Sequence, residues 1–132
     1  VMKFKKKIFN SLINEKDLNM WVIDNISSIE HEVKRIFFIN SKIDTIRGKH
    51  AHKNCWQTLV NIMGNLKISV DDGHEIFEIN LENHGEAVTI PPMYWCTQTY
   101  SEDTYLMVFC SKSYDENDYI RDYEEFKKLL KK

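Results

Sequence analysis

The feature that most constrains the fold is a series of short apolar runs with a period of two residues, between residues 33 and 110. This alternation is typical of β-strands that bury one face. Turn-forming residues separate the runs at intervals of roughly 8 to 12 residues, as in antiparallel sandwiches and barrels. The runs lie at 35–39, 66–70, 77–81 and 105–109, and the turns at 63–65, 71–73, 83–85 and 91–92. This part of the chain is therefore predicted to be all-β, with antiparallel strands.

The C-terminal segment follows a different pattern. Apolar side chains recur at intervals of three and four residues, at Ile120, Tyr123, Phe126 and Leu130. The spacing predicts one amphipathic α-helix over about residues 118–131, with Asp118 as its N-cap and lysines in its last turn. We expect this helix to pack on the outside of the sheet or on a partner subunit. Near the N-terminus, residues 21–23 are predicted to form a further strand.

Length and composition narrow the class of protein. We expect the 132 residues to form one domain, 1–132, with its core at about 33–110, because no repeat or linker divides the chain. The 18 basic and 20 acidic residues are interspersed, which argues against nucleic acid as a partner. Apolar stretches are too short for a signal peptide or a membrane span, so we expect a cytoplasmic protein without a membrane partner. Three cysteines without C-x-x-C spacing are expected to be reduced thiols.

Two histidines one residue apart, His50 and His52, are the first candidates for chemistry. They lie in the sequence RGKHAHK at residues 47–53. Such a pair can clamp a metal ion, can exchange protons near neutral pH, or can be two ordinary polar residues of a strand. The local sequence leaves all three interpretations open.

The spacing beyond the histidines fits the frame of a cupin-type jelly roll, in which three histidines and a carboxylate bind a metal. Here Gln57 stands in place of the glutamate and Cys96 in place of the third histidine, while Gly64 and Pro91 keep the spacing. The predicted fold is therefore a cupin-type antiparallel jelly-roll barrel with a C-terminal α-helix. The missing anionic oxygen ligand favours a metal-free site, although two imidazoles and a thiolate would still suit zinc or copper.

Four segments together resemble one enzyme family, the bacterial sugar-nucleotide 3,4-ketoisomerases. They are the run at 35–38, RGKHAHK, VDDG at 70–73 and the ending SKSYDENDYIRDYEEF. The resemblance covers about three quarters of the chain, from Lys34 to the C-terminus. It implies a jelly-roll homodimer without cofactor that moves the carbonyl of dTDP-4-keto-6-deoxyglucose from C4 to C3. The product would feed an aminotransferase, leading to 3-amino-3,6-dideoxy sugars of lipopolysaccharide O-antigen or S-layer glycan.

The resemblance also implies roles for individual residues. His52 is the expected main base, His50 its partner in handling protons or an oxyanion, and Arg47 the group that faces the diphosphate or the enediolate oxygen. The other expected substrate contacts are Arg35, Gln57, Tyr94, Trp95 and Cys96.

Departures from the family pattern keep alternatives open. Phe37 and Phe38 replace usual tyrosines, and Cys96 replaces a usual histidine, so the product can have the galacto or the gluco configuration. Three other functions remain compatible with the residues: a dTDP-sugar 3,5-epimerase, a metal-dependent cupin oxygenase with His50, His52 and Cys96 as ligands, and a non-catalytic module that binds a sugar nucleotide.

Overall fold

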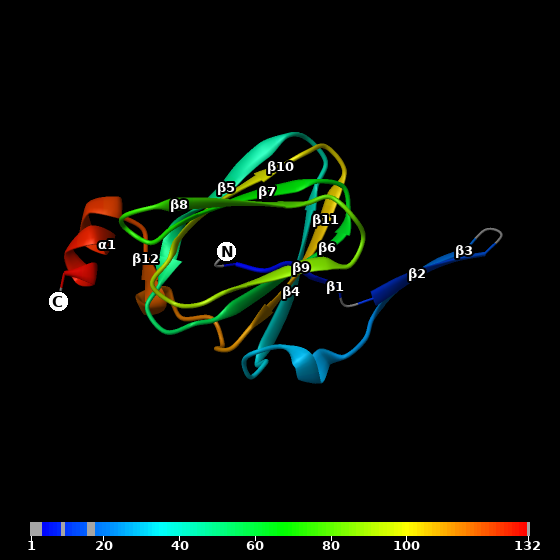
Figure 1. The fold of residues 1–132 in the computed structure, drawn as a ribbon, viewed down its shortest axis with the longest axis horizontal. Coiled ribbons are helices and arrows are strands. Elements are labelled where there is room, and N and C mark those ends of the chain that lie inside the picture. The colour runs from blue at the N-terminus through cyan, green and yellow to red at the C-terminus, as the bar shows by residue number, and fades with distance from the viewer. Residues whose placement is uncertain (1–3, 9, 16–17, 132) are drawn as a thin grey trace.

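Two antiparallel sheets of five strands each face one another in the computed structural model, which describes residues 4–8, 10–15 and 18–131 (Figure 1). The first sheet has the order β1-β9-β6-β11-β4 and the second the order β12-β5-β10-β7-β8. This architecture confirms the predicted all-β, antiparallel fold. The strands of the first sheet are Lys7–Ile8 (β1), Glu86–Ile90 (β9), Gln57–Met63 (β6), Thr104–Cys110 (β11) and Arg35–Ser41 (β4). Those of the second are Tyr119–Ile120 (β12), Thr45–His52 (β5), Trp95–Tyr100 (β10), Leu66–Asp71 (β7) and Ile76–Leu81 (β8).

The period-two pattern of the sequence decides which side chains lie between the sheets. In β7, Leu66, Ile68 and Val70 are buried, while Lys67 between them is exposed. Matching residues from the first sheet, such as Leu59 and Leu106, complete a core whose members are almost fully buried. In β7 the core positions therefore follow from alternation, because successive side chains of a strand point to opposite faces.

The C-terminal helix is shorter than predicted. It spans Tyr123–Leu130 (α1), and its N-cap is Asp122, whose side chain accepts a hydrogen bond from the Glu124 backbone. The predicted N-cap, Asp118, instead ends a 3₁₀ turn at Glu116–Asp118 (η2), and Tyr119–Ile120 follow as strand β12, paired with β5. The prediction of a helix from 118 was wrong because pairing with β5 keeps the backbone at Tyr119–Ile120 extended.

Helix α1 packs on the outer side of the second sheet, as the sequence analysis expected. The fully buried Phe126 contacts a cluster that includes Ala51 of β5 and Ile120 of β12. The Trp95 ring lies across the same cluster, with its centroid 5.7 Å from that of Phe126. Helix α1 and β12 thus form one unit attached to the edge of the second sheet.

A two-stranded hairpin projects from the opposite end of the molecule (Figure 1). It consists of Asn10–Glu15 (β2) and Leu18–Ile23 (β3), so the strand predicted at 21–23 is the end of β3. A 3₁₀ turn at Ile26–Ser28 (η1) leads from it to β4. Among the residues that the structure describes, there is no helix with the length and apolar character needed to cross a membrane.

The packing of α1 leads to a prediction about stability. Replacing Phe126 by Ala removes a fully buried ring between Ile120 and Trp95 and should lower the free energy of unfolding by about 3–5 kcal/mol. Urea denaturation measures this change. Glu125→Ala, at an exposed position of the same helix, is the control and should change the free energy by about 0.5 kcal/mol or less. Equal stability of the two variants would show that α1 contributes little to the fold.

Candidate functional site

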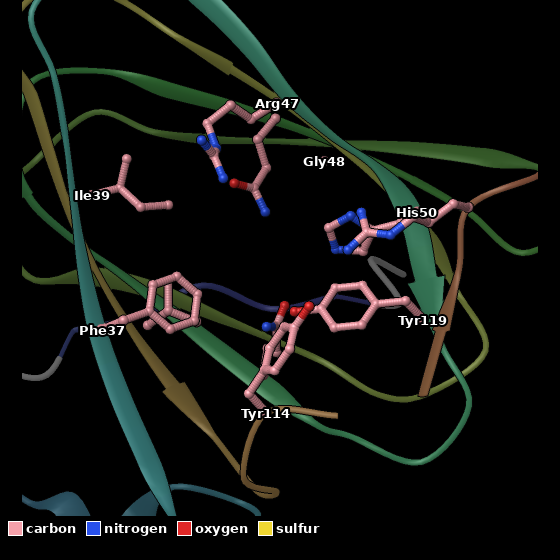
Figure 2. A pocket seen from close by; sticks show the side chains of 11 residues that line it. Phe37, Ile39, Arg47, Gly48, His50, Tyr114 and Tyr119 are labelled. Atoms are coloured by element: carbon pink, nitrogen blue, oxygen red, sulfur yellow. The ribbon is translucent and has the colours of Figure 1, made fainter. Parts of the chain in front are cut away.

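A cavity of about 260 Å³ lies inside one end of the barrel and is walled by both sheets and by the segment that leads to α1 (Figure 2). Its lining mixes aromatic, cationic and amide side chains, with one histidine. The lining residues are Phe37, Ile39, Arg47, Gly48, His50, Gln57, Gln98, Val108, Tyr114, Tyr119 and Arg121. Three of the expected site residues, Arg47, His50 and Gln57, therefore meet in one place.

A β-bulge in β5 brings Arg47 and His50 to the same face. The pairing of β10 with β5 shifts between Cys96, which faces His50, and Thr97, which faces Gly48, so Lys49 is left over. Gly48 has φ of 89°, and a Cβ there would lie 2.8 Å from the Cys96 carbonyl oxygen. Glycine in the left-handed region is the usual first residue of such a bulge. The extra residue allows side chains three positions apart to enter the cavity together.

His50 presents a neutral imidazole to the cavity. Burial, together with the smaller effect of the neighbouring His52, lowers the pKa of His50 to about 4. Its Nδ1 is buried and has no hydrogen-bond partner within the described part of the chain. An uncharged imidazole at neutral pH can accept a proton from a bound molecule.

His52 lies behind His50 and does not line the cavity. The two rings are nearly perpendicular, with centroids 5.0 Å apart. His52 is buried, and its Nδ1 lies 2.9 Å from a carboxylate oxygen of Asp118. The other Asp118 oxygen accepts a hydrogen bond of 2.7 Å from the Asn54 backbone N–H. The two histidines, equivalent in the sequence, therefore have different surroundings.

Residues of the C-terminal segment complete the site, and the sequence analysis missed them. The Tyr119 ring packs on both histidines, with centroids 5.0 Å from His50 and 4.4 Å from His52. The Arg121 guanidinium lies 4.3 Å from the centroid of the same ring. These residues belong to the string YDENDYIR, which resembles the family and which we expected to cap the helix and to pair it to the barrel or to the other subunit. The sequence thus contained the motif, but its assignment to a helix prevented us from placing Tyr119 and Arg121 in the site.

A hydrogen-bonded group at the mouth of the cavity connects Arg121 to Tyr114. Arg121 donates two hydrogen bonds of 2.7 and 2.9 Å to Glu116, and the Tyr114 hydroxyl donates one of 2.7 Å to the same carboxylate. The Arg121 guanidinium lowers the pKa of Glu116 to about 2. Glu116 therefore balances the charge of Arg121, whereas the described part of the chain offers Arg47 no ion pair.

The remaining predicted contacts lie away from the cavity lining. Arg35 lies below its aromatic wall, with the guanidinium 5.1 Å from the Phe37 centroid and a hydrogen bond of 3.6 Å to the Cys110 sulfur. Trp95 packs on α1, and Tyr94 packs edge-on against Phe4 at 5.2 Å. Arg35, Trp95 and Tyr94 are not among the residues that line the cavity, although the Arg35 guanidinium packs on the lining rings of Phe37 and Tyr114.

Cys96 is buried in the barrel core behind Gln98. Burial raises the pKa of the Cys96 thiol to about 11, so it is protonated at neutral pH. The Gln98 amide, which does line the cavity, donates a hydrogen bond of 3.9 Å to this sulfur. Of the two phenylalanines that replace family tyrosines, Phe37 lines the cavity, while Phe38 is 66% exposed on the outer face of β4.

The potential metal ligands differ from those that the cupin frame indicates. Within the described residues, the set of three that comes together is His52, Cys55 and Asp118, whose ligand atoms lie within 4.8 Å of one another. His50 and Cys96 are not part of it. Although nitrogen, sulfur and oxygen donors suit zinc, His52 and Asp118 are already hydrogen-bonded to each other. A cation held through His52 Nδ1 would have to displace that bond.

Comparisons with known proteins show the family to which the chain belongs. The family model described as "FdtA: WxcM-like, C-terminal" matches residues 2–131. A TDP-4-oxo-6-deoxy-α-D-glucose-3,4-oxoisomerase from Aneurinibacillus thermoaerophilus is 35% identical over 130 residues, which cover 93% of this chain and 94% of the relative.

Solved structures of similar enzymes have the same fold. A 3,4-ketoisomerase from Helicobacter canadensis superposes with a TM-score of 0.83, at 31% identity and complete coverage of both chains. A His-to-Asn mutant of the 3,4-ketoisomerase QdtA from Thermoanaerobacterium thermosaccharolyticum, in complex with TDP-4-keto-6-deoxyglucose, gives 0.80 at 27% identity, covering 99% of this chain and 96% of that one. The fold is thus the predicted cupin-type jelly roll, and the chain belongs to the FdtA family of dTDP-sugar 3,4-ketoisomerases, a group of isomerases.

Proposed function

We propose that this protein converts dTDP-4-keto-6-deoxyglucose into its 3-keto isomer by acid–base catalysis. The observation that carries this proposal is His50, an uncharged imidazole that faces a cavity lined with cationic and amide side chains. The names of the similar enzymes specify the same carbonyl shift and the same nucleotide sugar. The reaction exchanges protons within one molecule, so it requires a base but no redox cofactor.

His50 is the group we propose as the main base, in place of His52. The C4 carbonyl of the substrate acidifies the proton on C3, and His50 removes it to give an enediolate between C3 and C4. A proton then returns from the imidazolium to C4, and the proton of the C3 hydroxyl passes to the C4 oxygen, which completes the shift of the carbonyl. His50 suits this role because it lines the cavity, whereas His52 is turned toward Asp118.

Arg47 is the residue we propose for the anionic part of the substrate. It lines the cavity without an ion pair among the described residues, so its charge is available to the diphosphate or to the enediolate oxygen. Gln57 and Tyr119 also line the cavity, and their amide and hydroxyl supply further polar groups near His50. Donors placed where negative charge develops stabilise an enediolate relative to the ketone.

The 3-keto product has the chemistry that a sugar aminotransferase requires. Transamination of a C3 carbonyl on a 6-deoxyhexose gives a 3-amino-3,6-dideoxy sugar. We propose that the enzyme serves the synthesis of such sugars for surface glycans, such as O-antigen or S-layer glycan. The resemblance of RGKHAHK and of the C-terminal segment to the ketoisomerase family supports this assignment.

A homodimer is the assembly that we propose, through the outer face of the first sheet. Apolar side chains from β3, β4, β6 and β11 line a groove there: Trp21, Ile23, Phe38, Ile62, Met63, Tyr105 and Met107. Phe38 is 66% exposed and Trp21 42% exposed, and large apolar patches of this kind mark interfaces. The hairpin β2–β3 beside the groove projects from the barrel (Figure 1), where a second copy can contact it.

Turnover in deuterated water tests the reaction. The wild-type protein should convert dTDP-4-keto-6-deoxyglucose into the 3-keto sugar and place solvent deuterium at C3 or C4. Replacing His50 by Asn should lower kcat by about 10²–10⁴-fold, because the base is lost. NMR of the recovered sugar measures product and deuterium together.

Matched variants separate this assignment from its alternatives. His74→Asn, at an exposed position outside the cavity, should leave the rate unchanged. Deuterium at C5 would indicate a 3,5-epimerase. Full activity of His50→Asn, together with loss of activity in His52→Asn, would return the main role to His52.

The charge state of His50 should appear in the pH dependence of stability. The pKa is about 4 in the folded protein, against an ordinary value of 6.5, so the unfolded chain gains a proton first as the pH falls. Unfolding is therefore favoured progressively between those two values, by an amount on the order of 3 kcal/mol. His50→Asn should lose this contribution and His74→Asn should keep it, as measured by urea denaturation at about pH 7 and about pH 4.5. If the free energy of unfolding changed by the same amount between the two pH values in both variants, a neutral, buried His50 would be contradicted.

The dimer is tested by placing a charge in the groove. Phe38→Glu should yield a monomer, because a carboxylate at the centre of an apolar interface loses its hydration without a partner. Light scattering coupled to gel filtration measures the mass. Ile76→Glu is the control, since Ile76 is 64% exposed on β8, far along the other sheet. A Phe38→Glu protein that stays dimeric would exclude this surface.

A further inference from the structure

We propose that Asp118 is a positioning residue that fixes the tautomer and orientation of His52, the ring against which His50 and Tyr119 are packed. The inference deepens the proposed function, since its effect on turnover presupposes that His50 acts on the substrate. Its direct consequence, the tautomer of one imidazole, does not depend on any reaction.

The contacts of Asp118 define its position on both sides. One carboxylate oxygen lies 2.9 Å from His52 Nδ1. The other accepts the Asn54 N–H at 2.7 Å, and the Asp118 backbone carbonyl accepts the Lys53 N–H at 2.8 Å. Asp118 and His52 are each only 8% exposed, so water competes little for these bonds.

Hydrogen-bond chemistry then determines where the imidazole hydrogen lies. A carboxylate only accepts, so His52 Nδ1 must carry the hydrogen. When the ring is neutral, the lone pair is at Nε2. That atom is buried and has no partner among the described residues, which leaves it available as a proton acceptor behind the cavity.

The rings of His52, His50 and Tyr119 pack together, so the position of His52 affects the two residues that line the cavity. The His52 ring contacts the His50 ring, at 5.0 Å between centroids, and the Tyr119 ring, at 4.4 Å. Both neighbours line the cavity, while His52 does not. A rotation of His52 would therefore move the base and the adjacent phenol together, and proton transfer is sensitive to such displacements.

Replacing Asp118 by Asn should reverse the tautomer without changing the shape of the side chain. The Asn54 N–H can only donate, so the amide oxygen must stay on that side. The amide NH₂ then faces His52 Nδ1, which must become the acceptor, and the hydrogen moves to Nε2.

The experiment combines a spectroscopic readout with kinetics. Imidazole ¹⁵N NMR of the free wild-type protein should show His52 with its hydrogen on Nδ1, the signals being identified by their loss in His52→Asn. In Asp118→Asn the hydrogen should appear on Nε2. With dTDP-4-keto-6-deoxyglucose, kcat should fall by about 100-fold or more, while dTDP binding stays unchanged. Asp115→Asn, exposed and able to keep accepting the Asn117 N–H, is the matched control and should behave as wild type.

Specific results would overturn the inference. A wild-type His52 with its hydrogen on Nε2, observable even if Asp118→Asn does not fold, contradicts the proposed hydrogen bond. An Asp118→Asn protein with the reversed tautomer and wild-type kcat contradicts the link to catalysis. A stoichiometric metal ion that is lost in Asp118→Asn would make Asp118 and Cys55 ligands instead. A wild-type protein with the expected tautomer but without turnover would refute only the proposed function.

Discussion

The attachment of the C-terminal segment to β5 is the interaction on which the site depends. Asp118 binds the side chain of His52 and the backbone of Asn54, and Tyr119–Ile120 pair with Ala51–His52. This attachment places Tyr119 and Arg121 along the cavity and starts α1 over the second sheet. Without it, the end of the barrel that contains the histidines would lack one wall.

The core positions of strands such as β7 could be predicted from sequence, because burial of one face imposes alternation, whereas β6 is buried on both faces and carries no such pattern. Local spacing also singles out the pair His50 and His52, of which only His50 lines the cavity. The structure separated the two residues by their surroundings, which depend on Asp118, 66 positions further along the chain from His52. A single sequence does not contain such long-range pairing as a periodic pattern.

The start of the helix was predicted wrongly, and Tyr94 and Trp95 lie outside the cavity lining, for related reasons. Asp118 looks like an N-cap, and Ile120 continues the apolar spacing of α1, so helical periodicity and strand β12 compete for the same residues. Tyr94 and Trp95 sit next to a motif position, but neighbours in a strand face opposite ways, and Trp95 packs on α1 while Cys96 enters the core. Adjacency in sequence therefore says little about which residues share a cavity.

The bulge at Lys49 explains a detail of the motif itself. In an uninterrupted strand, residues 47 and 50 point to opposite faces, so an arginine and a histidine at that spacing could never meet. The extra residue shifts the alternation of side chains in β5 by one position. Every side chain of β5 from His50 onward therefore points to the face opposite the one it would have in a regular strand. The alternation changes at Gly48, the glycine of RGKH. The spacing between cation and imidazole in this motif thus reflects backbone geometry. Deletion of Lys49 would leave a regular strand in which Arg47 and His50, then two positions apart, still share the cavity face, so the bulge sets the distance between the two side chains along the strand.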